Sequence, residues 1–232
     1  VKDGAEVSEA DRGDRVEIVA EATPFYGEAG GQVGDVGTLT GLAGDPPAAV
    51  DIQGTIKDPT GLIIHTGHVV AGRIATNDPI RLSVSAEARR ATARNHTATH
   101  ILHAVLRETL GEHVKQAGSL VAPDRLRFDF THFSQIEPET LAAIEVQVNA
   151  HIQENVAAQT EEMDADQAFQ SGATALFEEK YGDRVRVVSL SAFSKELCGG
   201  THVQHTGELR GQRGPPAGHD HPQPAARSAA DL

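Results

Sequence analysis

The sequence predicts an α+β protein in which a small N-terminal β-barrel is followed by helices packed on an antiparallel sheet. Two features carry this prediction. Short β-branched runs alternate with turn residues up to residue 84, whereas apolar residues recur at helical spacing from residue 85 onward. We therefore expect a barrel over residues 1–84, a second domain over residues 85–209 and a disordered tail over residues 210–232.

The individual elements follow from local patterns. Turns rich in Gly, Pro and Asp separate five expected barrel strands, at residues 15–20, 36–39, 49–56, 62–70 and 79–84. Ser85 is the expected N-cap of a helix that ends at Gly111. A second helix begins near Pro138 and carries on one face Leu141, Ile144, Val148 and Ile152. The remaining strands are expected at residues 119–121, 125–130 and 185–189.

Composition limits the class of protein. The hydrophobic fraction of 39% is ample for a core, and no apolar run approaches the roughly 20 residues that span a bilayer. We expect a cytoplasmic protein with no membrane partner, and its single cysteine forms no internal disulfide. The net charge of −13 argues against non-specific nucleic-acid binding but allows a local basic patch. Because the chain begins with Val1 and its only methionine is Met163, we expect a piece of a longer protein.

Two short motifs a hundred residues apart predict a zinc site. His96 and His100 lie four residues apart, so on a helix both project from one face. Cys198 and His202 flank a glycine loop. Among twelve histidines one such pair would more often be accidental, but three imidazoles and one thiolate are the ligands that tetrahedral zinc prefers. The weaker candidate ligands are His103, His113 and His132.

The residues around the motifs limit the role of the metal. A helical zinc protease carries a glutamate after its first histidine, but Thr97 stands here, which disfavours proteolysis. Four protein ligands would close the site, as in structural zinc centres, so a catalytic zinc would need a ligand to be displaced or the shell to expand. Gly199 and Gly200 permit positive φ, which would let a tight loop bring sulfur and imidazole together.

Five blocks of the chain, in order, carry a resemblance to a known family. Residues 94–103, 114–121, 127–130 and 197–202 closely resemble the editing domain of bacterial alanyl-tRNA synthetases. Residues 23–35 resemble the glycine-rich stretch of the small barrel that precedes that domain. The resemblance covers about residues 1–209. It implies a zinc-containing deacylase that hydrolyses seryl- or glycyl-tRNA(Ala), with the acceptor end of tRNA(Ala) as partner. Nothing resembles the ATP-dependent core, so ligase activity is not expected.

The resemblance also implies roles for particular residues. Thr99 matches a threonine that contacts the serine side chain, although its hydroxyl could instead bond its own helix backbone. Gln116 matches a glutamine that orients water or the terminal ribose, and its alternative is an exposed position at a strand edge. Gly199 and Gly200 would present backbone N–H groups to the reacting carbonyl.

Contact with tRNA is expected from a glycine-rich stretch and from scattered cations. The expected tRNA-binding residues are Gly30, Gly31, Gln32, Arg89, Arg94 and Lys115, with further cations at Arg90, Arg125 and Arg127. Their alternatives are a plain barrel turn and surface ion pairs with Glu87, Glu108 and Asp124.

Residues 210–232 depart from the family, which continues with an apolar strand. They are rich in Gly, Pro and Ala and contain no β-branched or aromatic residue, so we expect disorder and an out-of-frame or truncated end, with His219 and His221 solvated. Three interpretations remain open. They are an editing deacylase, a zinc-stabilised tRNA-binding module without turnover, and an unrelated metallohydrolase. Oligomeric state does not follow from the sequence.

Overall fold

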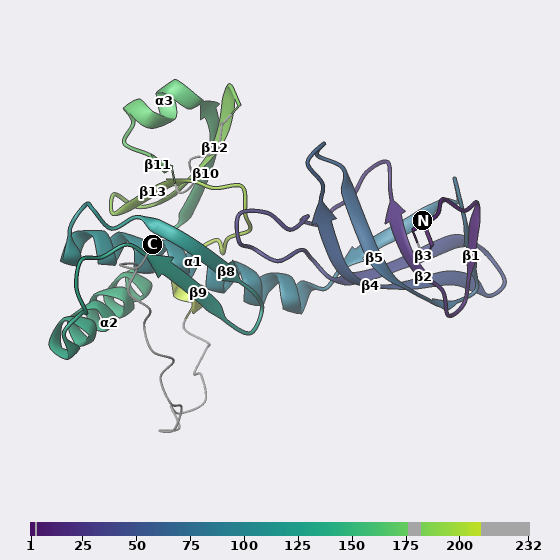
Figure 1. Ribbon diagram of the computed structural model, residues 1–232, viewed down its shortest axis with the longest axis horizontal. Coiled ribbons are helices and arrows are strands. Elements are labelled where there is room, and N and C mark those ends of the chain that lie inside the picture. The colour runs from purple at the N-terminus through teal and green to yellow at the C-terminus, as the bar shows by residue number, and fades with distance from the viewer. Residues whose placement is uncertain (3, 176–181, 210–232) are drawn as a thin grey trace, which may run out of the picture.

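The computed structural model describes residues 1–2, 4–175 and 182–209. It is a mixed α+β structure with several antiparallel sheets and few helices, as predicted. Figure 1 shows two lobes, here called the β lobe (β1 to β7) and the α/β lobe (α1 to η1), with α1 running between them. No helix of the described ranges is long and apolar enough to cross a membrane. The tail predicted at residues 210–232, with His219 and His221, lies outside the described residues.

The β lobe is built on one five-stranded antiparallel sheet of order β2-β5-β4-β3-β7. Its strands are β2 (Arg15–Val19), β3 (Gly37–Gly44), β4 (Pro47–Lys57), β5 (Ile63–Ala71) and β7 (Ile80–Val84), which confirms the five predicted strands. A separate pair, β1 (Glu9–Asp11) with β6 (Arg73–Ala75), was not predicted. The order leaves β2 and β7 as the two edges of the sheet, so the predicted closed barrel is not confirmed. The core of this lobe includes Leu39, Val50, Ile52 and Val69.

Helix α1 (Ala86–Leu110) begins and ends where its capping residues predict. The Ser85 hydroxyl accepts a hydrogen bond from the Ala88 amide, and Gly111 ends the helix with φ of 112°. Many of the side chains that α1 buries are polar, among them Thr92, Asn95, His96, Thr97, Thr99, His100 and His103. Buried polar groups need hydrogen-bond or metal partners, so this face of α1 indicates a functional site and not an ordinary apolar core.

Two more elements pack beside α1. The hairpin of β8 (Gln116–Val121) and β9 (Leu126–Phe130) confirms the predicted strand pair. Helix α2 (Pro138–Gln153) begins at the predicted proline. Ile144 is the one buried residue of α2, and Leu141 is 50% exposed, so the predicted apolar face is covered only in part.

A four-stranded sheet of order β10-β12-β13-β11 completes the α/β lobe, together with α3 (Ala165–Gln170) and the 3₁₀ turn η1 (Thr206–Leu209). The strands are β10 (Ala158–Asp164), β11 (Thr174–Ala175), β12 (Arg184–Leu190) and β13 (Ser194–Leu197). Strand β12 contains the predicted strand at residues 185–189. Strand β10 was missed because its side chains are mostly exposed and polar, which hides the alternation typical of a half-buried strand. Among the described strands of this sheet, β11 and β13 pair in parallel and the other two pairs are antiparallel.

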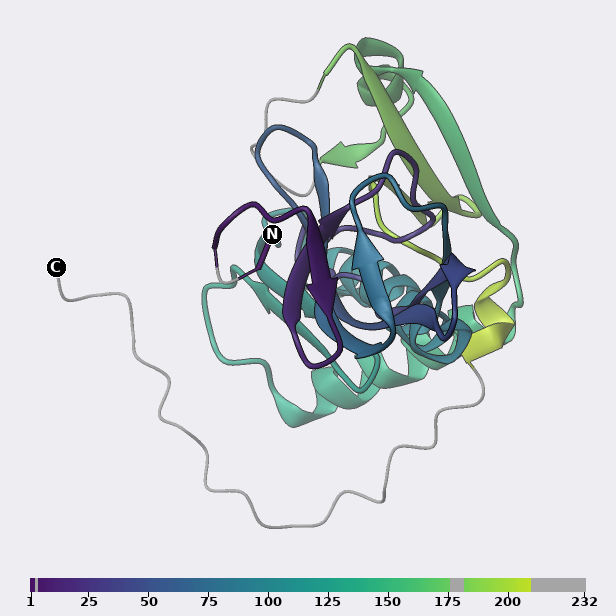
Figure 2. The ribbon, with the colours of Figure 1, turned by 90° about the vertical axis from the view of Figure 1, so that its right-hand side faces the viewer.

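The glycine-rich stretch at residues 23–35 joins the two lobes. The Val121 amide donates to the Gly31 carbonyl (2.7 Å), and the Val33 amide donates to the Val121 carbonyl (3.0 Å). Gly31 has φ of 83°, and a Cβ there would lie 2.7 Å from the Ser119 carbonyl oxygen, so only glycine fits this approach. In Figure 2, viewed from the side of the β lobe, the N-terminal strands lie in front of α1. The stretch therefore binds the β8–β9 hairpin and is more than a turn of the sheet.

Candidate metal centre

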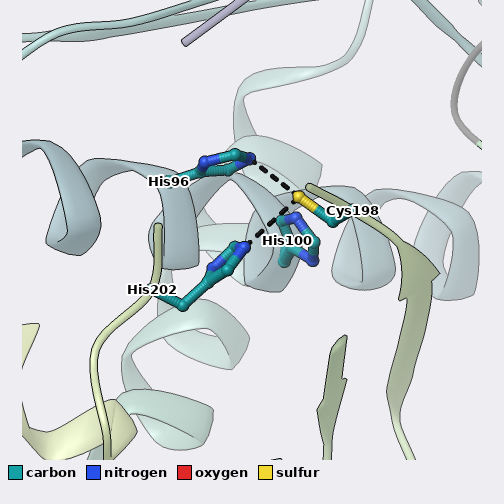
Figure 3. A group of neighbouring side chains, drawn as sticks. All are labelled: His96, His100, Cys198 and His202. Carbon is teal, nitrogen blue, oxygen red and sulfur yellow. Dashed lines mark hydrogen bonds between the residues drawn. The ribbon is translucent and has the colours of Figure 1, made fainter. Parts of the chain in front are cut away.

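Three elements bring the predicted ligands together. His96 and His100 project from α1, Cys198 directly follows β13, and His202 comes from the next loop (Figure 3). One ligand atom from each residue lies within 4.8 Å of all the others. The Sγ atom of Cys198 is 3.3 Å from Nε2 of His96 and 3.3 Å from Nε2 of His202. The predicted set of four is thus assembled from positions about a hundred residues apart.

The spacing of the donor atoms suits zinc. Zinc lies about 2.3 Å from a thiolate and about 2.0 to 2.1 Å from an imidazole nitrogen, so a sulfur and a nitrogen ligand of a tetrahedral site stand about 3.5 Å apart. The two sulfur–nitrogen distances of 3.3 Å are close to that separation. The Nε2 atom of His100 is buried and has no hydrogen-bond partner among the described residues, as expected of a ligand atom that binds a metal ion. The residues present therefore fit the ion.

Partners on the far side of the rings turn two of the histidines toward the cluster. Nδ1 of His96 lies 2.7 Å from the side-chain oxygen of Gln32, and Nδ1 of His202 lies 3.2 Å from the hydroxyl of Thr97. Because a side-chain amide oxygen only accepts, the proton of His96 is on Nδ1 and Nε2 is free to bind a metal. The Gln32 oxygen also accepts from the Thr201 amide (2.9 Å). Gln32, predicted only as a tRNA contact, thus ties the β lobe to the cluster.

Electrostatics favour the ligand form of the cysteine. Burial raises the pKa of the Cys198 thiol, but His96 and hydrogen bonds from the cluster lower it by more, so the pKa lies well below its usual range. Burial lowers the pKa of His202 to about 3, with help from the neighbouring His100 and His96. Burial lowers the pKa of His100 too, but the charges of Glu196 and Cys198 outweigh it and raise that pKa to about 9. A thiolate and a neutral imidazole are the forms that bind zinc.

The glycines of the Cys198 loop act differently from the prediction. The positive φ that the sequence permits at Gly199 and Gly200 is not used, because neither is among the positive-φ glycines of the described chain. Gly200 is needed for space, since a Cβ there would overlap the His96 ring and lie 2.7 Å from the Gln32 oxygen. Its amide points at the Cys198 sulfur (3.4 Å) and is not free for a reacting carbonyl. Gly199 has open space at its Cβ position.

This difference gives a matched pair of variants. Gly200→Ala is expected to push the His96 ring away from Cys198 and weaken zinc binding by roughly ten- to a hundredfold, the range seen when groups around a metal's ligands are disturbed. Gly199→Ala is expected to bind zinc like the wild type. Competition with a chelator measures both affinities. Equal affinities for the two variants would contradict the crowding at Gly200.

The other predicted site residues lie around the centre in different settings. The Thr99 hydroxyl donates to the Asn95 carbonyl (2.9 Å), which is the helix-backbone alternative. Gln116 is partly buried, its Nε2 has no hydrogen-bond partner, and no described hydrogen bond joins it to the cluster. Lys115 is exposed and Arg94 is partly buried, whereas Arg89 pairs with Asp35 across the lobe junction.

Several remaining candidates have other partners. His113 and His132 hydrogen-bond and stack on each other, and Arg125 and Arg127 pair with acidic neighbours. Sequence reasoning missed Thr97 as a partner of His202 and missed Glu196, which lies beside His100 and His103. The helical spacing of His96, His100 and His103 was the one available signal for a longer polar stripe.

The fold and the site define an α+β protein with a candidate metal site that residues of both lobes border. Comparison with known proteins is consistent with this class. The family described as tRNA synthetases class II (A) matches residues 1–88, and the threonyl and alanyl tRNA synthetase second additional domain matches residues 185–211. The alanine–tRNA ligase of Desulfosudis oleivorans is 56% identical over 211 residues, which cover 90% of this chain and 23% of that protein.

Two further relatives extend the match. The alanine–tRNA ligase of Anaeromyxobacter dehalogenans is 52% identical over 206 residues, with 89% of this chain and 22% of that protein covered. The enzyme of Myxococcus xanthus is 49% identical over 210 residues, with 90% and 23% covered. The chain belongs to the alanyl-tRNA synthetases as a fragment that spans a little under a quarter of the length of these relatives.

Proposed function

We propose that the chain is an editing module that hydrolyses the ester of seryl- or glycyl-tRNA(Ala), with zinc held by His96, His100, Cys198 and His202. The observation that carries the proposal is this four-residue cluster, in a chain that the second additional domain matches at residues 185–211. Bound zinc supplies a Lewis acid and a fixed anchor for the loop. Because four protein ligands close the site, the anchoring role is the simpler one.

The chain's own groups supply recognition. The Nε2 atom of Gln32 is fully buried beside the cluster and has no hydrogen-bond partner in the described part of the chain, so it can donate to an oxygen of a bound ligand. The Thr99 hydroxyl gives its proton to Asn95 and keeps lone pairs that can accept from the hydroxyl of serine. Gln116 has a second unpartnered buried amide. Contacts of Lys115 and Arg94 with phosphates of the acceptor end complete the proposed tRNA-binding set, with Gly30 and Gly31 shaping the glycine-rich stretch.

The direct test is deacylation by the purified, zinc-loaded chain. Seryl- and glycyl-tRNA(Ala) should be hydrolysed, and alanyl-tRNA(Ala) should be spared. A site that binds a hydroxyl discriminates between serine and alanine, whereas glycine, which also lacks the hydroxyl, must be distinguished from alanine by its smaller size. Binding of tRNA(Ala) without hydrolysis would favour the zinc-stabilised binding module. Hydrolysis of a simple ester at a similar rate would favour an unrelated metallohydrolase.

Thr99→Val tests whether Thr99 recognises the hydroxyl of the serine substrate. The variant keeps the β-branched shape but leaves the substrate hydroxyl unpaired in a buried site, which costs about 1 to 3 kcal/mol. Serine hydrolysis should fall roughly five- to a hundredfold, whereas glycine hydrolysis, which lacks that contact, should change little. The ratio of the two single-turnover rates is the measurement.

Thr92→Val is the matched control, because Thr92 is equally buried on α1 but lies a turn away from the ligands. It should leave the ratio of the two rates unchanged. An equal loss on both substrates in Thr99→Val would show that Thr99 supports the helix and does not read the side chain.

A further inference from the structure

A buried carboxylate stands behind the metal centre. Glu196, on β13, places Oε2 3.1 Å from Nδ1 of His100 and Oε1 2.9 Å from Nδ1 of His103. The three side chains are between 1% and 4% exposed. A charge buried this deeply is costly unless it is paired, and both of its described partners are histidines of α1. Glu196 therefore has a structural reason to face this helix.

Two simple periodicities produce the arrangement. Residues spaced by three or four lie on one face of a helix, so His103 continues the stripe that His96 and His100 begin. Alternate residues of a strand point to the same face, and Cys198 follows directly after β13, two residues beyond Glu196, so both side chains face α1. The Cys198 sulfur thus contacts the Nε2 atom of His96, whereas the Glu196 carboxylate contacts the Nδ1 atoms of His100 and His103.

The two contacts of Glu196 differ in kind. The contact with His103 is a hydrogen bond. The contact with His100 has the distance of an ion pair but not the angles of a hydrogen bond, and Glu196 Oε2 has no hydrogen-bond partner among the described residues. A carboxylate oxygen 3.1 Å from Nδ1 repels a lone pair on that nitrogen and attracts a proton there. The proton on Nδ1 leaves Nε2 of His100 to the metal.

His103 holds the carboxylate from the other side. Its ring packs against Phe128, with the ring centres 5.3 Å apart, and its Nδ1 hydrogen-bonds to the second oxygen of Glu196, Oε1. Its Nε2 is buried and has no partner among the described residues, so the one described hydrogen bond of the His103 side chain is to Glu196. His103, a weaker ligand candidate on sequence, thus binds the group that supports a ligand.

We propose that Glu196 is a positioning residue of the metal centre, which holds His100 with its proton on Nδ1 and its Nε2 toward the cluster, and that His103 keeps Glu196 in place. The inference rests on the metal-binding part of the proposed function and is independent of turnover. Carboxylate partners of this kind raise the basicity of a ligand histidine and fix its orientation, and their loss weakens metal binding by about ten- to a hundredfold.

The experiment compares two substitutions of similar size in the full chain, with Co²⁺ as the probe. Glu196→Met fills the space but offers no acceptor. Glu196→Gln offers an amide oxygen to His100, and its NH₂ can face His103, whose unpartnered Nε2 lets that ring shift its proton. Glu161→Met, at an exposed position of β10 in the same sheet, is the control. Affinity comes from competition with a chelator, and the thiolate–cobalt absorption reports the ligand set.

Glu196→Met is expected to weaken Co²⁺ binding by about ten- to a hundredfold and Glu196→Gln by less than about tenfold, with the four-ligand absorption reached at saturation in both. Equal affinities in the two variants, wild-type affinity in Glu196→Met, or the same loss in Glu161→Met would overturn the role of Glu196. Wild-type protein that binds no Co²⁺ would remove the metal centre and this role with it. Wild-type protein that binds Co²⁺ but hydrolyses no aminoacyl-tRNA would refute the proposed editing alone.

Discussion

Replacing Cys198 with alanine is expected to abolish metal binding and, with it, deacylation of seryl-tRNA(Ala). The thiolate is the group that both His96 and His202 approach, so its removal takes away one ligand and the partner of two others. Elemental analysis should find about one zinc per wild-type chain and almost none in the variant. The deacylation rate should fall by at least about a hundredfold. Chelation of the wild-type protein should reproduce the loss and lower its melting temperature.

His205→Ala is the control for Cys198→Ala, because His205 is exposed and only three residues beyond His202. It should retain zinc and activity. The β lobe should stay folded in Cys198→Ala, since its core of Leu39, Val50 and Val69 is separate from the cluster. A variant that keeps zinc and wild-type turnover would contradict the assignment of Cys198.

Replacing Arg89 with alanine is expected to destabilise the junction between the lobes. Nε of Arg89 lies 2.9 and 3.0 Å from the two oxygens of Asp35, whose side chain is only 5% exposed. Asp35 also accepts from the Tyr26 amide (2.6 Å), so it would stay buried with one donor and no counter-charge. Removing one partner of a buried pair costs about 3 to 5 kcal/mol, and the partial exposure of Arg89 reduces this to about 2 to 4 kcal/mol. Denaturant unfolding measures the change.

Arg90→Ala is the matched control, since Arg90 is the next residue of α1 and is exposed. It should alter the free energy of unfolding by less than about 0.5 kcal/mol. A double-mutant cycle with Asp35→Asn should show strong coupling to Arg89. Arg89 was predicted to bind tRNA. Weaker tRNA binding with unchanged stability in Arg89→Ala would favour that role over the structural one.

Local sequence patterns predicted the elements of this chain well. The five strands of the main sheet, the caps of α1 and the first residue of α2 depend on alternation, on Ser85 and Gly111, and on Pro138, all of which act within a few residues. The ligand set was predictable because its two halves are each local. His96 and His100 share a helix face, and Cys198 and His202 share a loop.

The sequence by itself thus determined the main secondary structure and the four candidate ligands, but only the tertiary structure decided what surrounds them. Gln32 reaches His96 over 64 residues, Glu196 reaches His103 over 93 residues, and Thr97 reaches His202 over 105 residues. No periodicity encodes such pairs. They form because α1 packs between the glycine-rich stretch and β13. Polar groups that are buried there lose their hydrogen bonds to water, and leaving them unpaired would cost free energy, so they form hydrogen bonds with each other.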